Sequence, residues 1–190
     1  MQCSLLEKMC SILMAAGIPA DILTETINTI SESIRGSQAS QEFFSRVNAP
    51  SNPPKPALIL LLMSMVNEKQ PFALRCAVIY CFQCYLHKNP SRQHEIMSTL
   101  LPSHQRDVAL ASDVTAGQLL CGGLFSSDRL SNWFSSVGLA HGLMDQESIK
   151  VELLRVQLST NHGNEPISLL LQCCNILQQT SNVQTRLGNE

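Results

Sequence analysis

The sequence predicts an all-α protein, an α-solenoid of stacked helical repeats. Apolar residues recur at the spacing of amphipathic helices along most of the 190 residues. Short apolar segments begin near residues 4, 57, 116 and 166, and a second helical segment follows each of them 12 to 17 residues later. A helix pair that recurs every 50 to 59 residues is typical of a solenoid, in which each unit packs on its neighbours.

The predicted repeat units are residues 4–47, 57–100, 116–158 and 166–190. They are longer than the roughly 40 to 47 residues of an ordinary armadillo or HEAT unit, because the first three units each add a third helix and a loop. The fourth unit is expected to be truncated within its second helix, which begins near residue 182. Residues 1–190 are therefore expected to be part of one larger helical domain.

The first unit contains three predicted helices. The first helix is expected to start at a capping box that begins at Ser4 and to end at Gly17. A second helix is predicted over residues 21–36, because leucine and isoleucine recur there on one helical face. A short third helix surrounds Phe44. The segment Asn48–Pro56 contains four prolines in nine residues, so it is predicted to be a loop.

A long apolar helix that starts at Pro71 is predicted to lie at the centre of the fold. The shorter helix before it, over residues 57–66, is rich in leucine and methionine, which favours helix over a buried strand. Between Pro71 and His87 only Arg75, Gln83 and His87 are strongly polar, and they share about one third of the helical circumference. These three side chains are expected to face solvent, while neighbouring helices cover the other sides.

The later helices continue the same pattern. They are predicted over residues 91–100, 116–125, 128–144, 146–158 and 166–177, with polar loops at 102–114 and 160–164. Ser127 or Asp128 is expected to cap the third of these helices, because their side-chain oxygens suit an N-cap. Trp133 lies in the apolar register of that helix. It is expected to anchor the core rather than to join a ladder of Asn and Trp residues that grips peptides.

Charge and composition argue against several classes of protein. The net charge is only −2 and no two of the 13 Lys and Arg residues are adjacent, which argues against binding of nucleic acid or direct binding of lipid. The first residues lack the pattern of a signal peptide, and no apolar run approaches the ~20 residues that span a bilayer. Six of the eight cysteines lie in apolar helical segments, so a reducing, cytosolic setting is expected.

Cys81, Cys84 and His87, with His94 beyond them, are the strongest candidate metal ligands, because two cysteines and two histidines can bind zinc. Cys81, Cys84 and His87 lie within one predicted helix that has no turn to bring them onto a single ion. Packing in the core is therefore the favoured interpretation, and no metal site is expected.

Other short motifs lack the partners that chemistry requires. Gly122-Gly123 is not followed by the Lys and Ser or Thr of a phosphate loop, so it indicates a close helix approach or a local break. The adjacent cysteines Cys173 and Cys174 are assigned to packing. Because no nucleophile elbow or paired-carboxylate spacing is present, no enzyme, catalytic residue or cofactor is expected. A zinc or thiol enzyme is kept as a remote alternative.

Several stretches resemble a known family. They are NAPSNPPKPA, LLMSMVNEKQPFALRCAV, AGQLLCGGLFSSDRLSNW, ELLRVQLST and LLLQCCNIL. They resemble the globular head of the general vesicular transport factors, a family of Golgi vesicle tethers, and the similarity runs from about residue 5 to residue 187. The resemblance implies an armadillo-like head domain and a coiled-coil tail. It also implies a role in docking vesicles between the endoplasmic reticulum and the Golgi before SNARE-mediated fusion.

The resemblance further implies partners and a location. The implied partners are an early-secretory Rab GTPase, SNARE proteins and golgins, and the implied location is the cytoplasmic side of Golgi and ER–Golgi intermediate membranes, with indirect membrane association. A homodimer formed through a coiled coil is also implied. Because these residues contain no sustained heptads, the golgin contacts and the coiled coil are assigned to a tail outside them. The alternative is another armadillo-type adaptor for peptides or cargo.

The candidate partner-binding residues lie at two junctions between helices. Junctions that recur along one edge of a solenoid form an aligned surface, on which such proteins bind their partners. The candidates are Asn67, Glu68, Lys69, Gln70, Asp128 and Arg129.

Overall fold

The computed structural model describes residues 2–101, 114–158 and 166–187, with side chains for residues 5–101, 114–157 and 166–178. Helices make up almost all of the regular structure in these ranges, so the predicted all-α class is confirmed. The chain divides into two compact parts, Met1–Gln146 and Glu147–Glu190. The predicted loops at 102–114 and 160–164 lie, apart from residue 114, outside the described residues.

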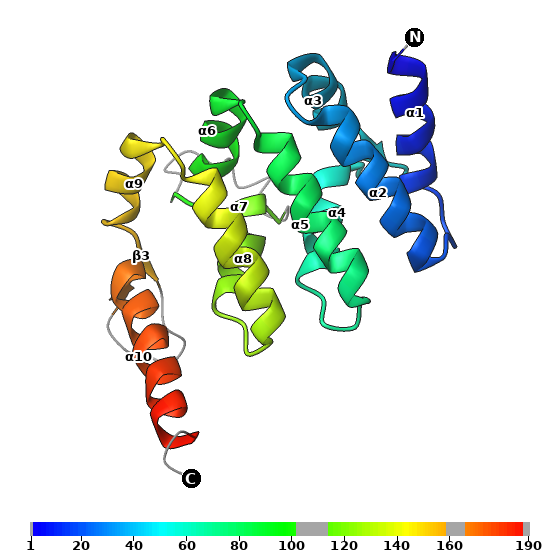
Figure 1. Cartoon of the computed structure of the whole chain (residues 1–190). Helices are drawn as coiled ribbons and strands as arrows, with labels where there is room; N and C mark the ends of the chain where they lie inside the picture. The colour runs from blue at the N-terminus through cyan, green and yellow to red at the C-terminus, as the bar shows by residue number, and fades with distance from the viewer. Residues whose placement is uncertain (1, 102–113, 159–165, 188–190) are drawn as a thin grey trace. The chain divides into compact units, whose positions relative to one another are not determined.

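The first part contains three successive groups of helices (Figure 1). The first group is α1 (Gln2–Leu13), α2 (Ala20–Ile34) and α3 (Gln38–Ser45). The second group is α4 (Ala57–Met65), α5 (Phe72–Leu86) and α6 (Pro90–Ser98). The third group contains α7 (Ala116–Leu124) and α8 (Arg129–Gly142).

The long helices of the first part form one layer. The central helix α5 lies between α2 and α8 and packs on both (Figure 1). The short helix α4 packs on α5, and the short helix α7 packs on α8. Because α4 and α7 also pack on each other, they form a second layer. Ten of the fifteen residues of α5 are buried, which confirms its predicted central place. This stacking of helix pairs is the armadillo-like packing that the repeat predicted.

The exposed side of α5 differs from the prediction. Gln83 and His87 are partly exposed, as expected, but Arg75 is only 2% exposed. The prediction that Arg75 faces solvent is therefore wrong. A charged side chain can be buried when fixed partners compensate its desolvation, and α8 supplies such partners.

The buried side of α8 also differs from the prediction. The prediction that Trp133 anchors the core is wrong, because its side chain is 55% exposed. The buried residues of α8 are Ser131, Phe134, Ser135, Gly138 and Gly142. Most of them are small, which lets α8 approach its neighbours closely.

Close approach is clearest at the second glycine of the Gly122-Gly123 pair in α7. A Cβ atom at Gly123 would lie 2.0 Å from Ser135 Oγ and 2.9 Å from Val66 Cγ1. A Cβ atom at Gly122 would meet no atom within 4 Å. The predicted close helix approach is therefore confirmed at Gly123, where only hydrogen leaves room for α8.

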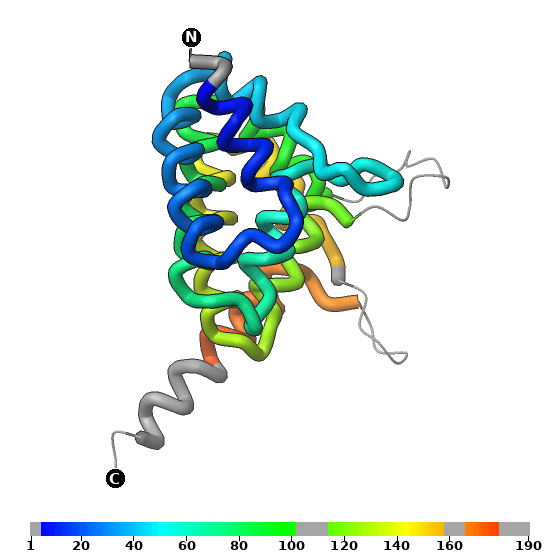
Figure 2. The backbone as a smooth tube through the Cα atoms, turned by 90° about the vertical axis from the view of Figure 1, so that its right-hand side faces the viewer, coloured from blue at the N-terminus to red at the C-terminus, as the bar shows by residue number. Residues whose placement is uncertain are grey.

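Two details of the first group differ from expectation. The first helix begins at Gln2, so Ser4 lies inside α1 and the predicted capping box is wrong. The proline-rich segment is not entirely a loop, because β1 (Asn48–Ala49) pairs antiparallel with β2 (Lys55–Pro56). This hairpin projects away from the side on which α2 lies (Figure 2).

The second part contains α9 (Glu147–Leu153), β3 (Gln157–Leu158), β4 (Ile167–Ser168) and α10 (Leu169–Leu187). The prediction of a helix through residue 158 is wrong, because β3 pairs antiparallel with β4 there. The predicted start of a new helix near residue 182 is also wrong, since α10 is continuous. Cys173 is partly exposed and Cys174 is exposed, so their assignment to core packing is not supported. Within the described ranges, no helix has the length and apolar character needed to cross a membrane.

The two glycines of α7 provide a matched test of this packing. Gly123→Ala is expected to destabilise the protein by about 1 to 3 kcal/mol, because the new methyl group must displace Ser135 and α8. Gly122→Ala is expected to be neutral or to stabilise by up to about 1 kcal/mol, because alanine favours an exposed helix position. Urea unfolding of both variants, followed by circular dichroism, measures the difference. Equal stability of the two variants would contradict the close approach.

Candidate partner-binding edge

The loop between α4 and α5 forms a compact turn at one edge of the first part. The backbone N–H of Lys69 donates to Asn67 Oδ1 at 3.0 Å, and the backbone N–H of Gln70 donates to Asn67 O at 3.1 Å. The side chains of Asn67, Glu68 and Lys69 are exposed, and that of Gln70 is partly exposed. The turn therefore presents one anionic and one cationic side chain to solvent.

The turn between α7 and α8 is organised by Asp128, which confirms its predicted role as the N-cap. Its carboxylate accepts hydrogen bonds from the backbone N–H groups of Leu130 at 3.4 Å and Ser131 at 3.0 Å. Its own backbone N–H donates to Ser126 Oγ at 3.1 Å. The neighbouring side chain of Arg129 is exposed.

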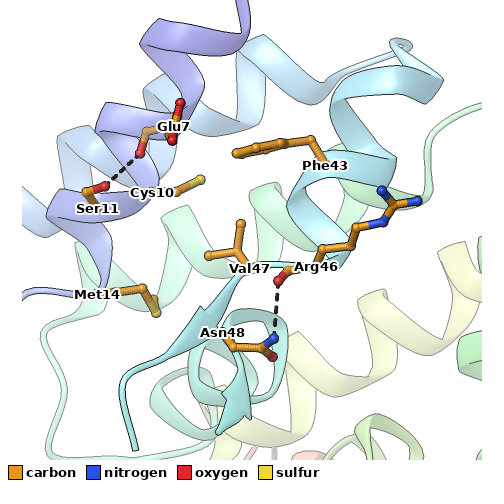
Figure 3. A pocket seen from close by; sticks show the side chains of 8 residues that line it. All are labelled: Glu7, Cys10, Ser11, Met14, Phe43, Arg46, Val47 and Asn48. Carbon is orange, nitrogen blue, oxygen red and sulfur yellow. Dashed lines mark hydrogen bonds between the residues drawn. The ribbon is translucent and has the colours of Figure 1, made fainter.

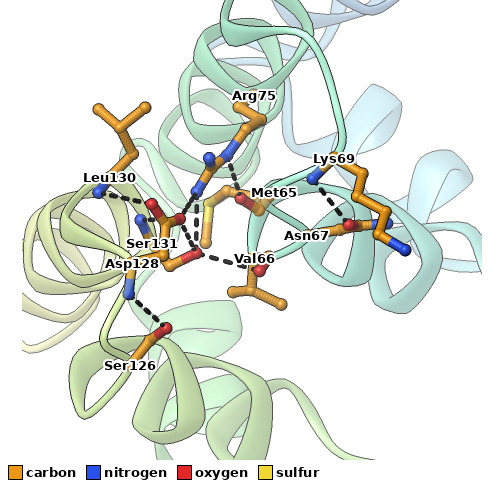
Figure 4. A network of polar contacts seen from close by, with 9 residues as sticks. All are labelled: Met65, Val66, Asn67, Lys69, Arg75, Ser126, Asp128, Leu130 and Ser131. Atoms are coloured by element: carbon orange, nitrogen blue, oxygen red, sulfur yellow. Dashed lines mark hydrogen bonds and ion pairs between the residues drawn. The ribbon is translucent and has the colours of Figure 1, made fainter.

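The two turns are joined through the guanidinium of Arg75 (Figure 4). Its Nε donates to Met65 O at 2.7 Å, at the end of α4. Its Nη2 donates to Asp128 Oδ2 at 2.6 Å and to Ser131 Oγ at 2.8 Å, at the start of α8. Ser131 Oγ also lies 3.0 Å from Val66 O. These five residues form what we call the Arg75 network.

The Arg75 network compensates the cost of burying a charge. The guanidinium remains charged, so its removal from water requires acceptors around it. Besides the three hydrogen-bond partners, the ring of Phe134 lies 5.3 Å from Arg75 Cζ, as in a cation–π contact. The hydrogen bonds from Ser131, followed by those from Arg75, hold the pKa of the Asp128 carboxyl well below its usual range. Asp128 is therefore ionised and already paired.

The six candidate residues thus have different roles in the structure. The loop at residues 67–70 and the turn at Arg129 are brought to one edge, with exposed side chains. Asp128 instead caps α8 and pairs with Arg75, so it links the two turns of the edge. The sequence did not predict that Arg75, Ser131 and Phe134 take part in this edge, although an arginine inside an otherwise apolar helix was a signal that a buried partner existed.

A separate cavity lies between α1 and the segment from α3 to β1 (Figure 3). Its volume is about 520 Å³, and it is lined by Glu7, Cys10, Ser11, Met14, Phe43, Arg46, Val47 and Asn48. The Ser11 hydroxyl donates to Glu7 O and the Asn48 amide donates to Arg46 O. Burial raises the pKa of the Cys10 thiol to about 11. A protonated thiol and side chains bonded to their own elements do not form a catalytic constellation.

Two of the three cysteines of α5 lie in the core, and the third, Cys76, is partly exposed. Cys81 and Cys84 are 1% and 2% exposed, so their predicted packing is confirmed. Burial raises the pKa of the Cys81 thiol to about 12, which disfavours the thiolate that would bind a metal. Among the described residues, no group of three or more His, Cys, Asp or Glu side chains is arranged to hold a metal ion.

Comparison with known proteins places the chain in a family. The family described as Uso1/p115-like vesicle tethering proteins, head region, matches residues 37–188. The chain belongs to this family. General vesicular transport factor p115 from Homo sapiens and from Bos taurus is 64% identical to it over 187 residues, which is 98% of this chain. The chain spans 19% of the length of these relatives.

Removing the acidic partner of Arg75 is expected to destabilise this head segment. Asp128→Ala should lower the free energy of unfolding by about 3 to 5 kcal/mol, because it removes the anionic partner of a buried guanidinium. Asp128→Asn removes the charge but keeps an N-cap oxygen, so its loss should be smaller by about 1 kcal/mol.

Arg129→Ala is the matched control, because Arg129 adjoins Asp128 but is exposed. Its effect should stay within about 0.5 kcal/mol. Chemical unfolding measures all three variants. A change after Asp128→Ala as small as that after Arg129→Ala would show that the ion pair contributes little.

The same ion pair predicts a pH dependence. Because the pKa of Asp128 is lowered in the folded state, its contribution is fully present above the usual carboxyl pKa of about 4. The contribution is lost as the pH falls below that value, because protonation is easier in the unfolded chain. The difference in unfolding temperature between the wild type and Asp128→Asn should therefore become smaller as the pH falls from 4 to 2. Thermal unfolding of both proteins across that range measures it. A gap that stays constant would contradict the linkage.

Proposed function

We propose that this chain is part of the armadillo-like head of a vesicle-tethering factor and that it acts as a protein-binding scaffold. On this proposal it serves transport from the endoplasmic reticulum to the Golgi and within the Golgi, where it docks vesicles before SNARE-mediated fusion. The carrying observation is the 64% identity to general vesicular transport factor p115 over 98% of the chain. The names of the relatives and of the family describe transport and tethering, not catalysis.

The proposed setting is the cytoplasmic surface of Golgi and ER–Golgi intermediate membranes, reached through other proteins. The proposed partners of the head are an early-secretory Rab GTPase and SNARE proteins. Golgin contacts and coiled-coil dimerisation are assigned to parts of the protein outside this segment. Residues 1–190 are proposed to form part of one head domain, with repeat units over residues 4–47, 57–100, 116–158 and 166–190. The single helix described in the last unit is α10.

The partner-binding surface is proposed to include the edge at the starts of α5 and α8. Support comes from the exposed side chains of Asn67, Glu68, Lys69 and Arg129 and from the partly exposed Gln70. The Arg75 network holds the two turns in fixed positions, so a partner can bind them without a large loss of conformational entropy. Asp128 is proposed to position Arg129 rather than to contact a partner.

Charge reversal at the edge tests this proposal. Glu68→Lys, Lys69→Glu and Arg129→Glu, combined in the complete head domain, should weaken binding of a GTP-loaded early-secretory Rab or of SNARE proteins by about tenfold or more, as truncation of interface hot spots does. Surface plasmon resonance with purified partners measures the effect. The reason is that the variant reverses every exposed charge on these two turns.

Lys88→Glu is the matched control, because Lys88 is exposed beyond the other end of α5 and its reversal changes the net charge by the same amount. Binding should be unchanged in this variant. If the triple variant binds both classes of partner as tightly as the wild type, this edge is not the binding surface.

A further inference from the structure

Two aromatic side chains are exposed beside the proposed edge. Phe72, in the first turn of α5, is 59% exposed, and Trp133 on α8 is 55% exposed. Both contact the fully buried ring of Phe134, with ring centroids 6.2 Å and 5.1 Å away, respectively. Leu130, one helical turn before Trp133, is 38% exposed. We call Phe72, Leu130 and Trp133 the aromatic patch.

The aromatic patch rests on a rigid support. Besides Phe72 and Trp133, the ring of Phe134 contacts Arg75, whose guanidinium is fixed by hydrogen bonds to Met65 O and Asp128. Large aromatic side chains that are held in place lose little conformational entropy when a partner covers them. Residues of this kind supply much of the binding energy in protein interfaces.

The surroundings of the patch favour an acidic partner. Helices α5 and α8 both begin at this edge, so the positive ends of their dipoles meet there. The N-cap of α5 is Pro71, which offers no side-chain cap to the first N–H groups of the helix. The carboxylate of Asp128 is neutralised by Arg75. Of the exposed charges on the two turns, Lys69 and Arg129 are positive and only Glu68 is negative.

We propose that the aromatic patch docks an amphipathic helix whose apolar face is flanked by acidic residues. The patch consists of side chains on two helices. Apart from the first N–H groups of α5, the backbone groups of these helices are bonded internally, so they offer no strand edge with which an added strand could pair. A partner must therefore satisfy its own backbone hydrogen bonds, as a helix does. Leucine or aromatic side chains cover the patch, and carboxylates face Lys69, Arg129 and the start of α5. The inference specifies what kind of partner binds at the edge. It rests on the proposed function in one respect, that the edge is a binding surface.

Trp133 is the only tryptophan of the chain, so its fluorescence reports on the patch alone. The probes are three synthetic helical peptides of about four turns. The first has a leucine face flanked by glutamates, the second has the same face flanked by lysines, and the third keeps the glutamates but replaces the leucines with serines. Each is titrated into the whole chain, into Phe72→Ala and into Ile22→Ala. Ile22 is the control, because it is 50% exposed but lies on α2.

The first peptide is expected to shift the Trp133 emission to shorter wavelength in a saturable way and to bind about tenfold more tightly than either other peptide. Phe72→Ala should weaken this binding about tenfold, whereas Ile22→Ala should leave it unchanged. Circular dichroism confirms that both variants are folded. Equal binding of all three peptides, or an unchanged affinity after Phe72→Ala, would overturn the proposal.

A second copy of the chain is the competing occupant. An emission shift that grows with protein concentration alone and is lost in Phe72→Ala would show self-association through the patch and would also overturn the proposal. The peptide titration is separate from the test of the proposed function. If charge reversal does not affect Rab or SNARE binding, the result of the peptide titration is still valid. If the peptides do not bind, the proposal that Rab or SNARE proteins bind at the edge is not affected.

Discussion

The buried guanidinium of Arg75 is the constraint on which the first part of the structure depends. A charge that is only 2% exposed needs fixed acceptors, and those of Arg75 come from the end of α4 and the start of α8. Three helices must therefore keep one relative arrangement for the charge to be compensated. The same arrangement fixes Phe134 behind the aromatic patch and aligns the two turns of the proposed binding edge.

Side chains that donate to a carbonyl at the end of a neighbouring helix recur along the structure. Arg75 and Asn132 are the fourth residues of α5 and α8, and each donates to the last carbonyl of the short helix before it, in α4 and α7. Gln41 and Gln93 are the fourth residues of α3 and α6, and each donates to carbonyls at the end of the long helix of the next group. Side chains from neighbouring helices thus satisfy carbonyls that a helix end leaves unpaired. Groups of different sequence keep the same packing because these polar bonds recur at equivalent positions.

These features suit a protein that works by presenting a surface. The cysteines with the strongest metal-binding spacing are buried, and in the cavity beside α1 the Ser11 hydroxyl and the Asn48 amide are bonded to nearby backbone carbonyls. The exposed features are a charged edge and an aromatic patch that share one support.

Local patterns in the sequence determined the helical class, the order and spacing of most helices, the central place of α5, the cap at Asp128 and the family. Helix periodicity, capping and turn residues act within a few positions, so they can be recognised without the fold. Only the tertiary structure decided that Arg75 is buried and that Trp133 is exposed, because each depends on partners more than 50 residues away in sequence or on which side of a helix its neighbours cover. The same dependence explains why the candidate loop and turn could be proposed from the sequence, whereas the network that joins them could not.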